Sequence, residues 1–252
     1  MLRLWLPLLL AALTALGRPS GVAAVRPAEG LAWPPYALER SVCFGDYAVC
    51  VWASCDASAP SFYRVVTIER EGEVLACMDW VTGLGELSGT DIDGSGWPNV
   101  IVEAYSGGAH CCFATTVYDL AENLVSIELP PSPGGNATAE FVDLDGDRVC
   151  EVLTADDSFA YTYCAYAGSP AVRAVLTYDA LGQRYMPTSF LYPELYVPEI
   201  RRDTERARAA LSTGADLGWD GTPKCEVLPL VLDLLYSGDP DGAWRALEAY
   251  YP

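Results

Sequence analysis

The chain has 252 residues, with 34 acidic and 15 basic side chains and a formal net charge of -19 at pH 7. This charge disfavours nucleic acids and anionic membrane surfaces as partners, because both would be repelled by it. Divalent cations are compatible with it, although simple solubility explains the overall charge better. A functional claim must therefore depend on where the acidic residues lie.

The first residues have the pattern of a secretory signal peptide. Arg3 precedes an apolar run over residues 4–16, and small residues up to Ala24 offer a cleavage site. The run is too short to cross a bilayer comfortably as a helix. We therefore expect residues 1–24 to be a signal peptide and the mature protein to be soluble, without a membrane span, and secreted or periplasmic. A single lysine, Lys224, among many arginines indicates a GC-rich bacterial source.

The sequence has nine cysteines, all of them downstream of the expected signal peptide. Disulfides are the default expectation for such a number in an exported protein. Because nine is odd, at least one thiol is expected to be free or to pair outside the chain. The spacing does not reveal the connectivity of Cys43, Cys50, Cys55, Cys77, Cys111, Cys112, Cys150, Cys164 and Cys225.

Most of the chain is predicted to be β structure. Residues 25–40, rich in Pro and Ala, are expected to form a lead-in segment, and residues 41–192 a β-rich domain of short antiparallel strands. A hairpin is expected around Glu71, and Tyr161 and Tyr163 would share one face of a strand. The expected strands cover residues 47–52, 62–68, 74–80, 100–105, 110–120, 140–142, 152–155, 159–166 and 171–178.

The last part of the chain has a helical pattern instead. Residues 198–211, 226–236 and 241–251 are predicted helices, with a break at Gly238 to Pro240. Trp244, Leu247 and Tyr251 would form one apolar face that packs in the core. We expect residues 193–252 to form a small helical cap on the sheet.

An internal repeat contains the residues of greatest chemical interest. The run TDIDGSGWPNVI at residues 90–101 recurs as VDLDGDRVCEVL at residues 142–153, about fifty residues later. Calcium prefers six or more oxygen ligands from carboxylates, amides and backbone carbonyls. A tight loop that projects alternate residues inward supplies such ligands. The predicted ligands are Asp91, Asp93, Ser95, the carbonyl of Trp97 and Asn99 in the first loop, and Asp143, Asp145, Asp147, the carbonyl of Val149 and Glu151 in the second.

The spacing is that of the start of an EF-hand loop, yet the loops are not EF-hands. Val102 and Thr154 occupy the twelfth position, where an EF-hand has an acid, and strands rather than helices follow. Gly96 lies at a turn where a positive φ is commonly needed, and Arg148 replaces it in the second loop. The second loop offers four side-chain carboxylates and the first only two. We therefore expect tighter binding by the second loop, provided that Arg148 is tolerated.

These residues resemble the FG-GAP or VCBS-type repeat, which occurs in integrin-like propellers and in many exported bacterial proteins. The resemblance covers residues 89–105 and 140–157, and implies calcium binding by the loop between strands. Residues 105–113 also resemble a segment of uncharacterised exported bacterial proteins that carry such loops. Asn99 and Arg148 depart from the pattern. Two copies imply a mainly β, antiparallel, blade-like meander with two DxDG calcium loops, not a full closed propeller.

The function that follows is an exported, calcium-stabilised β-domain without catalytic residues, which binds a protein or glycan ligand outside the cell or at the envelope. Calcium serving only the fold, with a partner surface among exposed aromatics, is a second possibility. The alternative is an exported hydrolase that uses His110 with Cys112, or carboxylates near Asp156 and Asp157. Core packing and disulfide formation explain His110 and its neighbours without catalysis.

Overall fold

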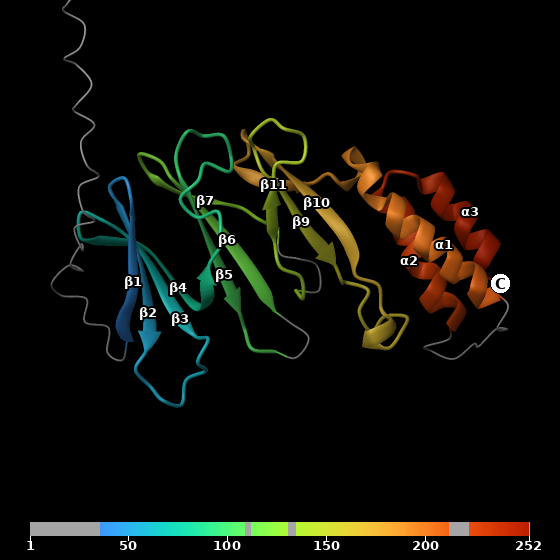
Figure 1. Cartoon of the computed structure of the whole chain (residues 1–252), viewed down its shortest axis with the longest axis horizontal. Coiled ribbons are helices and arrows are strands. Elements are labelled where there is room, and N and C mark those ends of the chain that lie inside the picture. Colours follow the sequence, from blue (N-terminus) through green and yellow to red (C-terminus); the bar gives the residue numbers. More distant parts are fainter. Residues whose placement is uncertain (1–35, 109–111, 131–134, 212–221, 252) are drawn as a thin grey trace, which may run out of the picture.

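The structure is a computed structural model that describes residues 36–108, 112–130, 135–211 and 222–251. The expected signal peptide, most of the lead-in segment, His110 and Cys111 lie outside these ranges. Within them, two antiparallel sheets and a group of helices follow one another along the long axis of the molecule (Figure 1). The predicted mainly β fold with a C-terminal helical region is therefore confirmed.

The first sheet is a meander of seven strands in sequence order. Its register places Glu71 and Gly72 at the turn of a tight hairpin, with φ of 53° and 83°, the left-handed conformations that such turns use. The strands are β1 (Tyr36–Phe44), β2 (Tyr47–Ser54), β3 (Arg64–Arg70), β4 (Glu73–Leu84), β5 (Asn99–Tyr105), β6 (Phe113–Leu120) and β7 (Leu124–Ile127).

The second sheet has four strands, again connected as a meander, in the spatial order β11-β10-β9-β8. A backbone hydrogen bond of 2.8 Å from Tyr185 to Glu128 connects it to the first sheet. Its strands are β8 (Glu140–Val142), β9 (Glu151–Asp156), β10 (Val172–Asp179) and β11 (Arg184–Pro187).

One apolar cluster joins the two sheets. Ile101 of β5 and Val117 of β6 pack with Val152 of β9, and Tyr185 of β11 is completely buried among them. Ile92 comes from the first repeat loop and is 1% exposed. This loop is therefore fixed to the core that both sheets share, although loops usually lie on the surface.

Three α-helices lie at the C-terminal end of the described residues, beyond the second sheet (Figure 1). They are α1 (Val197–Leu211), α2 (Thr222–Tyr236) and α3 (Pro240–Tyr250), and a disulfide between Cys164 and Cys225 ties α2 to the segment after β9. No helix of the described residues combines the length and the apolar character that crossing a bilayer would require.

Several predictions about individual elements were wrong. Residues 159–166 form turns rather than a strand, because Tyr161 adopts a φ of 60° and its N–H is held by the Ser169 hydroxyl. Trp244 and Tyr251 are 64% and 47% exposed, so they are not core residues. Ala243 and Ala246 are buried instead, since their small side chains allow α3 to pack closely on α2. The strand β1 begins inside the expected lead-in segment, and β7 and β11 were not predicted.

The expectation of widespread disulfides is met only in part. Cys164 and Cys225 are joined, and Cys112 is also disulfide-bonded. The remaining described cysteines, Cys43, Cys50, Cys55, Cys77 and Cys150, carry free thiols.

Candidate metal centre

The two repeat loops share a pattern of backbone-to-side-chain hydrogen bonds. In each, four matched hydrogen bonds of 2.7–3.2 Å run from backbone N–H groups to the side chains that were predicted as ligands. The donor and acceptor pairs are Ile92 to Asn99, Ser95 to Asp93, Gly96 to Asp91 and Trp97 to Ser95 in the first loop, and Leu144 to Glu151, Asp147 to Asp145, Arg148 to Asp143 and Val149 to Asp147 in the second.

The matched loops also share their left-handed residues. Gly94 and Gly146 have φ of 72° and 85°, and the second such position is Gly96 in one loop and Arg148 in the other, with φ of 86° and 77°. Arg148 is therefore accommodated, but in a conformation that costs an L residue about 1–2 kcal/mol. The sequence predicted a turn with a positive φ at Gly96, and the structure shows that Arg148 adopts the same conformation in the second loop.

In the second loop, carboxylates converge on one point. Asp143, Asp145 and Glu151 each place a carboxylate oxygen within 4.8 Å of the others. Burial raises the pKa of Glu151, which is 3% exposed, whereas hydrogen bonds from the Leu144 N–H and the Tyr192 hydroxyl oppose that rise. Asp147, the remaining acid of this loop, uses one oxygen to accept the Val149 N–H.

The first loop is more deeply buried. Asp93 is 5% exposed, and one of its carboxylate oxygens, Oδ2, has no hydrogen-bond partner. Asn99 is completely buried, and its Oδ1 accepts the Ile92 N–H at 2.8 Å. Asp91 and Ser95 remain exposed and accept backbone N–H groups of the loop. The carbonyls of Trp97 and Val149 as ligands stay predictions.

A third acid, Asp119 of β6, lies beside the first loop, and sequence reasoning missed it. The register of β5 and β6 places it opposite Asn99. Burial, and next the charge of Asp93, raise the pKa of Asp119 to about 6, while a hydrogen bond with Ser95 acts in the opposite direction. Asp119 is 7% exposed, and its Oδ1 has no hydrogen-bond partner.

The two loops contact each other, at the upper edge of the sheets in Figure 1. The Cys150 N–H donates to the Ile92 carbonyl at 2.7 Å, and a Cβ added to Gly94 would lie 2.9 Å from a methyl group of Val149. Tyr178 of β10 interacts with the first loop from the second sheet through a hydrogen bond with Asp93. Burial, and next the charges of Asp93 and Asp119, raise the pKa of Tyr178 to about 12. The loops thus form one acidic region at the junction of the sheets.

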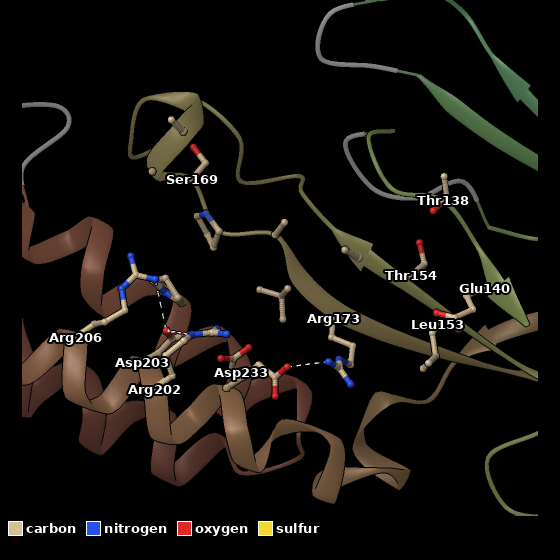
Figure 2. A pocket seen from close by; sticks show the side chains of 18 residues that line it. Thr138, Glu140, Leu153, Thr154, Ser169, Arg173, Arg202, Asp203, Arg206 and Asp233 are labelled. Atoms are coloured by element: carbon tan, nitrogen blue, oxygen red, sulfur yellow. Dashed lines mark hydrogen bonds and ion pairs between the residues drawn. The ribbon is translucent and has the colours of Figure 1, made fainter. Parts of the chain in front are cut away.

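A separate cavity of about 650 Å³ lies between the second sheet and α1 and α2 (Figure 2). Its helical wall carries the buried carboxyls of Asp203 and Asp233, which are hydrogen-bonded to each other. Arg202 donates two hydrogen bonds of 2.9 Å to Asp203. Across the cavity, Arg173 of β10 forms an ion pair of 2.8 Å with Glu199. The ion pair of Arg173 with Glu199 holds α1 to the second sheet.

The residues of the alternative, hydrolytic hypothesis do not form a catalytic group among the described residues. Cys112 is disulfide-bonded and so offers no thiolate, and His110 is outside the described ranges. Asp156 accepts hydrogen bonds from the Tyr236 hydroxyl and the Ser158 N–H. Burial raises the pKa of its neighbour Asp157. Asp156 therefore has a structural role at the contact with α2.

No protein-family model and no solved structure matches the chain. An uncharacterised protein of Sinorhizobium fredii is 34% identical over 83 residues, which make up 32% of this chain and 13% of that protein. A protein of Synechocystis sp., described as a probable thylakoid lumen protein, is 30% identical over 118 residues, which make up 44% of this chain and 34% of that protein. The chain thus spans about a third or less of the length of each relative.

Proposed function

We propose that each repeat loop binds one calcium ion, and that the chain is an exported, calcium-stabilised β-domain with a binding or cell-envelope role. The observation that carries this proposal is the convergence of Asp143, Asp145 and Glu151, whose carboxylate oxygens lie within 4.8 Å of one another. Like charges at this separation repel, so a cation among them lowers the energy of the folded state.

The surroundings of the loops favour a metal ion, rather than an Arg or Lys side chain, as the partner of the loop acids. Among the ion pairs of the described residues, none connects a loop acid to Arg or Lys. The donors that the acids do have are uncharged. They are mainly backbone N–H groups of the loops, with the Tyr192 hydroxyl at Glu151 and the Tyr178 hydroxyl at Asp93, and they fix the orientation of the acids without neutralising their charge. Calcium suits this set because it tolerates relaxed geometry and prefers oxygen ligands.

An exported location agrees with three features. The N-terminus has the pattern of a signal peptide, the structure holds a disulfide between Cys164 and Cys225, and one relative is described as a probable thylakoid lumen protein. Calcium sites in extracellular modules have dissociation constants on the order of 0.1–1 mM. We infer the same range for these loops, because Asp143 and Asp145 are exposed to solvent.

Calorimetric titration of the metal-free protein with calcium tests the proposal. We expect a stoichiometry of two, and one ion fewer in the variant Asp145→Asn, which removes a converging carboxylate without changing its shape. Glu248→Gln, an exposed acid of α3, is the matched control and should retain both ions. Absence of calcium binding by the unaltered protein, or an unchanged stoichiometry in Asp145→Asn, would contradict the proposal.

A further inference from the structure

We propose that Asp119 of β6 is a ligand of the calcium ion in the first loop, so that this ion joins the loop to the neighbouring strand. This inference rests on the proposed calcium function and deepens it. It assigns a ligand from outside the repeated motif, at a position that lies 20 residues after Asn99.

The pairing of β5 with β6 brings Asp119 to the loop. Asn99 is the last predicted ligand of the first loop and also the first residue of β5, and its partner in the register is Asp119. Side chains of directly opposed residues lie on the same face, with Cβ atoms about 4.5–5.5 Å apart. A backbone hydrogen bond of 3.0 Å from Leu120 to Pro98 fixes this alignment.

Two buried carboxylate oxygens at this place have no hydrogen-bond partner, although the Tyr178 hydroxyl interacts with the Asp93 carboxylate. They are Oδ1 of Asp119 and Oδ2 of Asp93, in side chains that are 7% and 5% exposed. Leaving such groups unpaired is costly, and buried charges in proteins are normally paired or coordinate a metal. The Asn99 side-chain nitrogen, which could donate, is itself without an acceptor. A cation bound between the two carboxylates satisfies both of them.

Asp119 also equalises the charge of the two sites. The second loop brings together three carboxylates, from Asp143, Asp145 and Glu151. The first loop has Asn99 in the position of Glu151 and so has only two acids of its own. Among the described residues, these acids and Asp119 do not come within 4.8 Å of one another as those of the second loop do, so on this proposal binding of the ion draws Asp119 in as the third carboxylate. The second loop, which has its own third acid, receives none from the neighbouring strand. Val152 pairs with Leu176 of β10, so the residue of β10 beside Glu151 is Thr177, which has no carboxylate.

Luminescence of bound terbium, a calcium substitute, can report the first site alone. Trp97 belongs to the first loop and is 49% exposed, whereas Val149 occupies the matching position in the second. Emission that disappears in Trp97→Phe is sensitised by Trp97, and reading it in the Asp145→Asn background assigns it to the first site, because the two loops touch. We expect this emission to fall at least tenfold at a fixed, subsaturating terbium concentration in Asp119→Asn, and to be retained in Asp145→Asn.

The matched control is Asp157→Asn. Asp157 is also 7% exposed and also has an unpartnered Oδ1, but it lies outside both loops. It should leave the emission and the calcium stoichiometry unchanged. Retention of two ions with unaltered affinities in Asp119→Asn would overturn the inference while leaving the proposed function intact. Absence of calcium binding by the unaltered protein would instead remove the proposed function, and the inference with it.

Exchanging the side chains of Asn99 and Asp119 keeps the inference testable if Asp119→Asn does not fold. The double variant Asn99→Asp/Asp119→Asn moves the third carboxylate into the loop and leaves the total charge unchanged. We expect it to bind two calcium ions and to recover the Trp97-sensitised emission. A folded double variant that binds only one ion would contradict the idea that a third carboxylate is what the first site needs.

Discussion

Arg148 adopts a left-handed backbone conformation, with φ of 77°, that its counterpart Gly96 adopts without a steric penalty. Its N–H donates to Asp143 at 3.1 Å, which is the bond that Gly96 makes to Asp91. The loop therefore retains its shape by straining one residue. The same residue also places a positive charge in the loop that is proposed to hold calcium.

Replacing Arg148 by Gly should remove both the backbone strain and the positive charge from the second loop. We expect Arg148→Gly to stabilise the metal-free protein by roughly 1 kcal/mol, because the left-handed conformation costs glycine nothing. Calcium affinity of the second loop should rise several-fold, since a like-charged neighbour of the ion is removed. Urea denaturation and calorimetric titration measure the two quantities.

The variant Arg148→Gln separates the contribution of the charge from that of the backbone strain. It removes the charge but keeps a side chain in the left-handed conformation, so affinity should rise without the gain in stability. Equal affinities of both variants and the unaltered protein would show that the charge of Arg148 does not act on the ion.

The loop residues proposed as ligands could be predicted from sequence because they follow one another at fixed spacing. The position of Asp119 beside them could not, because it depends on the register with which β6 pairs with β5. The only signal was an acid near the end of an expected strand. Tyr178 and Tyr192 come from distant segments and had no signal at all.

At the scale of elements, α1 and α2 meet at a pair of buried carboxyls. Asp203 of α1 and Asp233 of α2 are 1% and 4% exposed. Burial, and next the hydrogen bond and charge of Asp203, raise the pKa of Asp233 to about 7, although Arg202 opposes the shift. A protonated Asp233 can donate to Asp203, which also accepts two hydrogen bonds from Arg202.

This pair should make the stability of the helical cap depend on pH. The pKa of Asp233 is about 7 in the folded protein, against about 3.9 in an unfolded chain. Between these values only the folded state keeps the proton, so the free energy of unfolding falls as pH rises from about 4 to about 7. The contribution is fully present below that interval and lost above it.

The variant Asp233→Asn tests the assignment, because an amide donates to Asp203 at every pH. Urea denaturation at pH 5 to 8, in the presence of a chelator, should show the variant gaining stability relative to the unaltered protein as pH rises. Glu248→Gln should follow the unaltered protein throughout. A difference between Asp233→Asn and the unaltered protein that stays constant with pH would contradict the shared proton.

Elements with a clear period were predicted well, and those decided by tertiary contacts were not. The hairpin at Glu71 and the helix ending at Leu211 follow from local patterns. The strand expected over residues 159–166 fails because the Ser169 hydroxyl and the Cys164 disulfide fix turns there. The core position expected for Trp244 fails because helical spacing does not reveal which face meets α2.

At the scale of the whole molecule, the two repeat loops lie at the junction of the two sheets. Ile92 of the first loop is buried in the cluster that joins both sheets, and its carbonyl accepts the Cys150 N–H at 2.7 Å. Folding brings the carboxylates of both loops together in this region, in a chain whose net charge is already -19, so their mutual repulsion opposes folding. Ions bound there would relieve repulsion at the junction of the sheets, not only at an exposed turn.

Calcium should therefore raise the thermal stability of the whole β region. With dissociation constants near 0.1 mM, 1 mM calcium adds about 1.4 kcal/mol per site. Two sites would raise Tm by roughly 5–10 °C for a chain of this size. Differential scanning calorimetry with and without a chelator measures the shift.

Hydrogen exchange can localise the same effect. Calcium should slow exchange of the Cys150 amide, which bridges the loops, and leave that of Ala246, in α3 of the helical cap, nearly unchanged. Sodium chloride of equal ionic strength is the control, because screening of the net charge would protect all amides alike. Equal protection by salt and by calcium would mean that the loops respond to charge screening, and that no ion need bind at the junction.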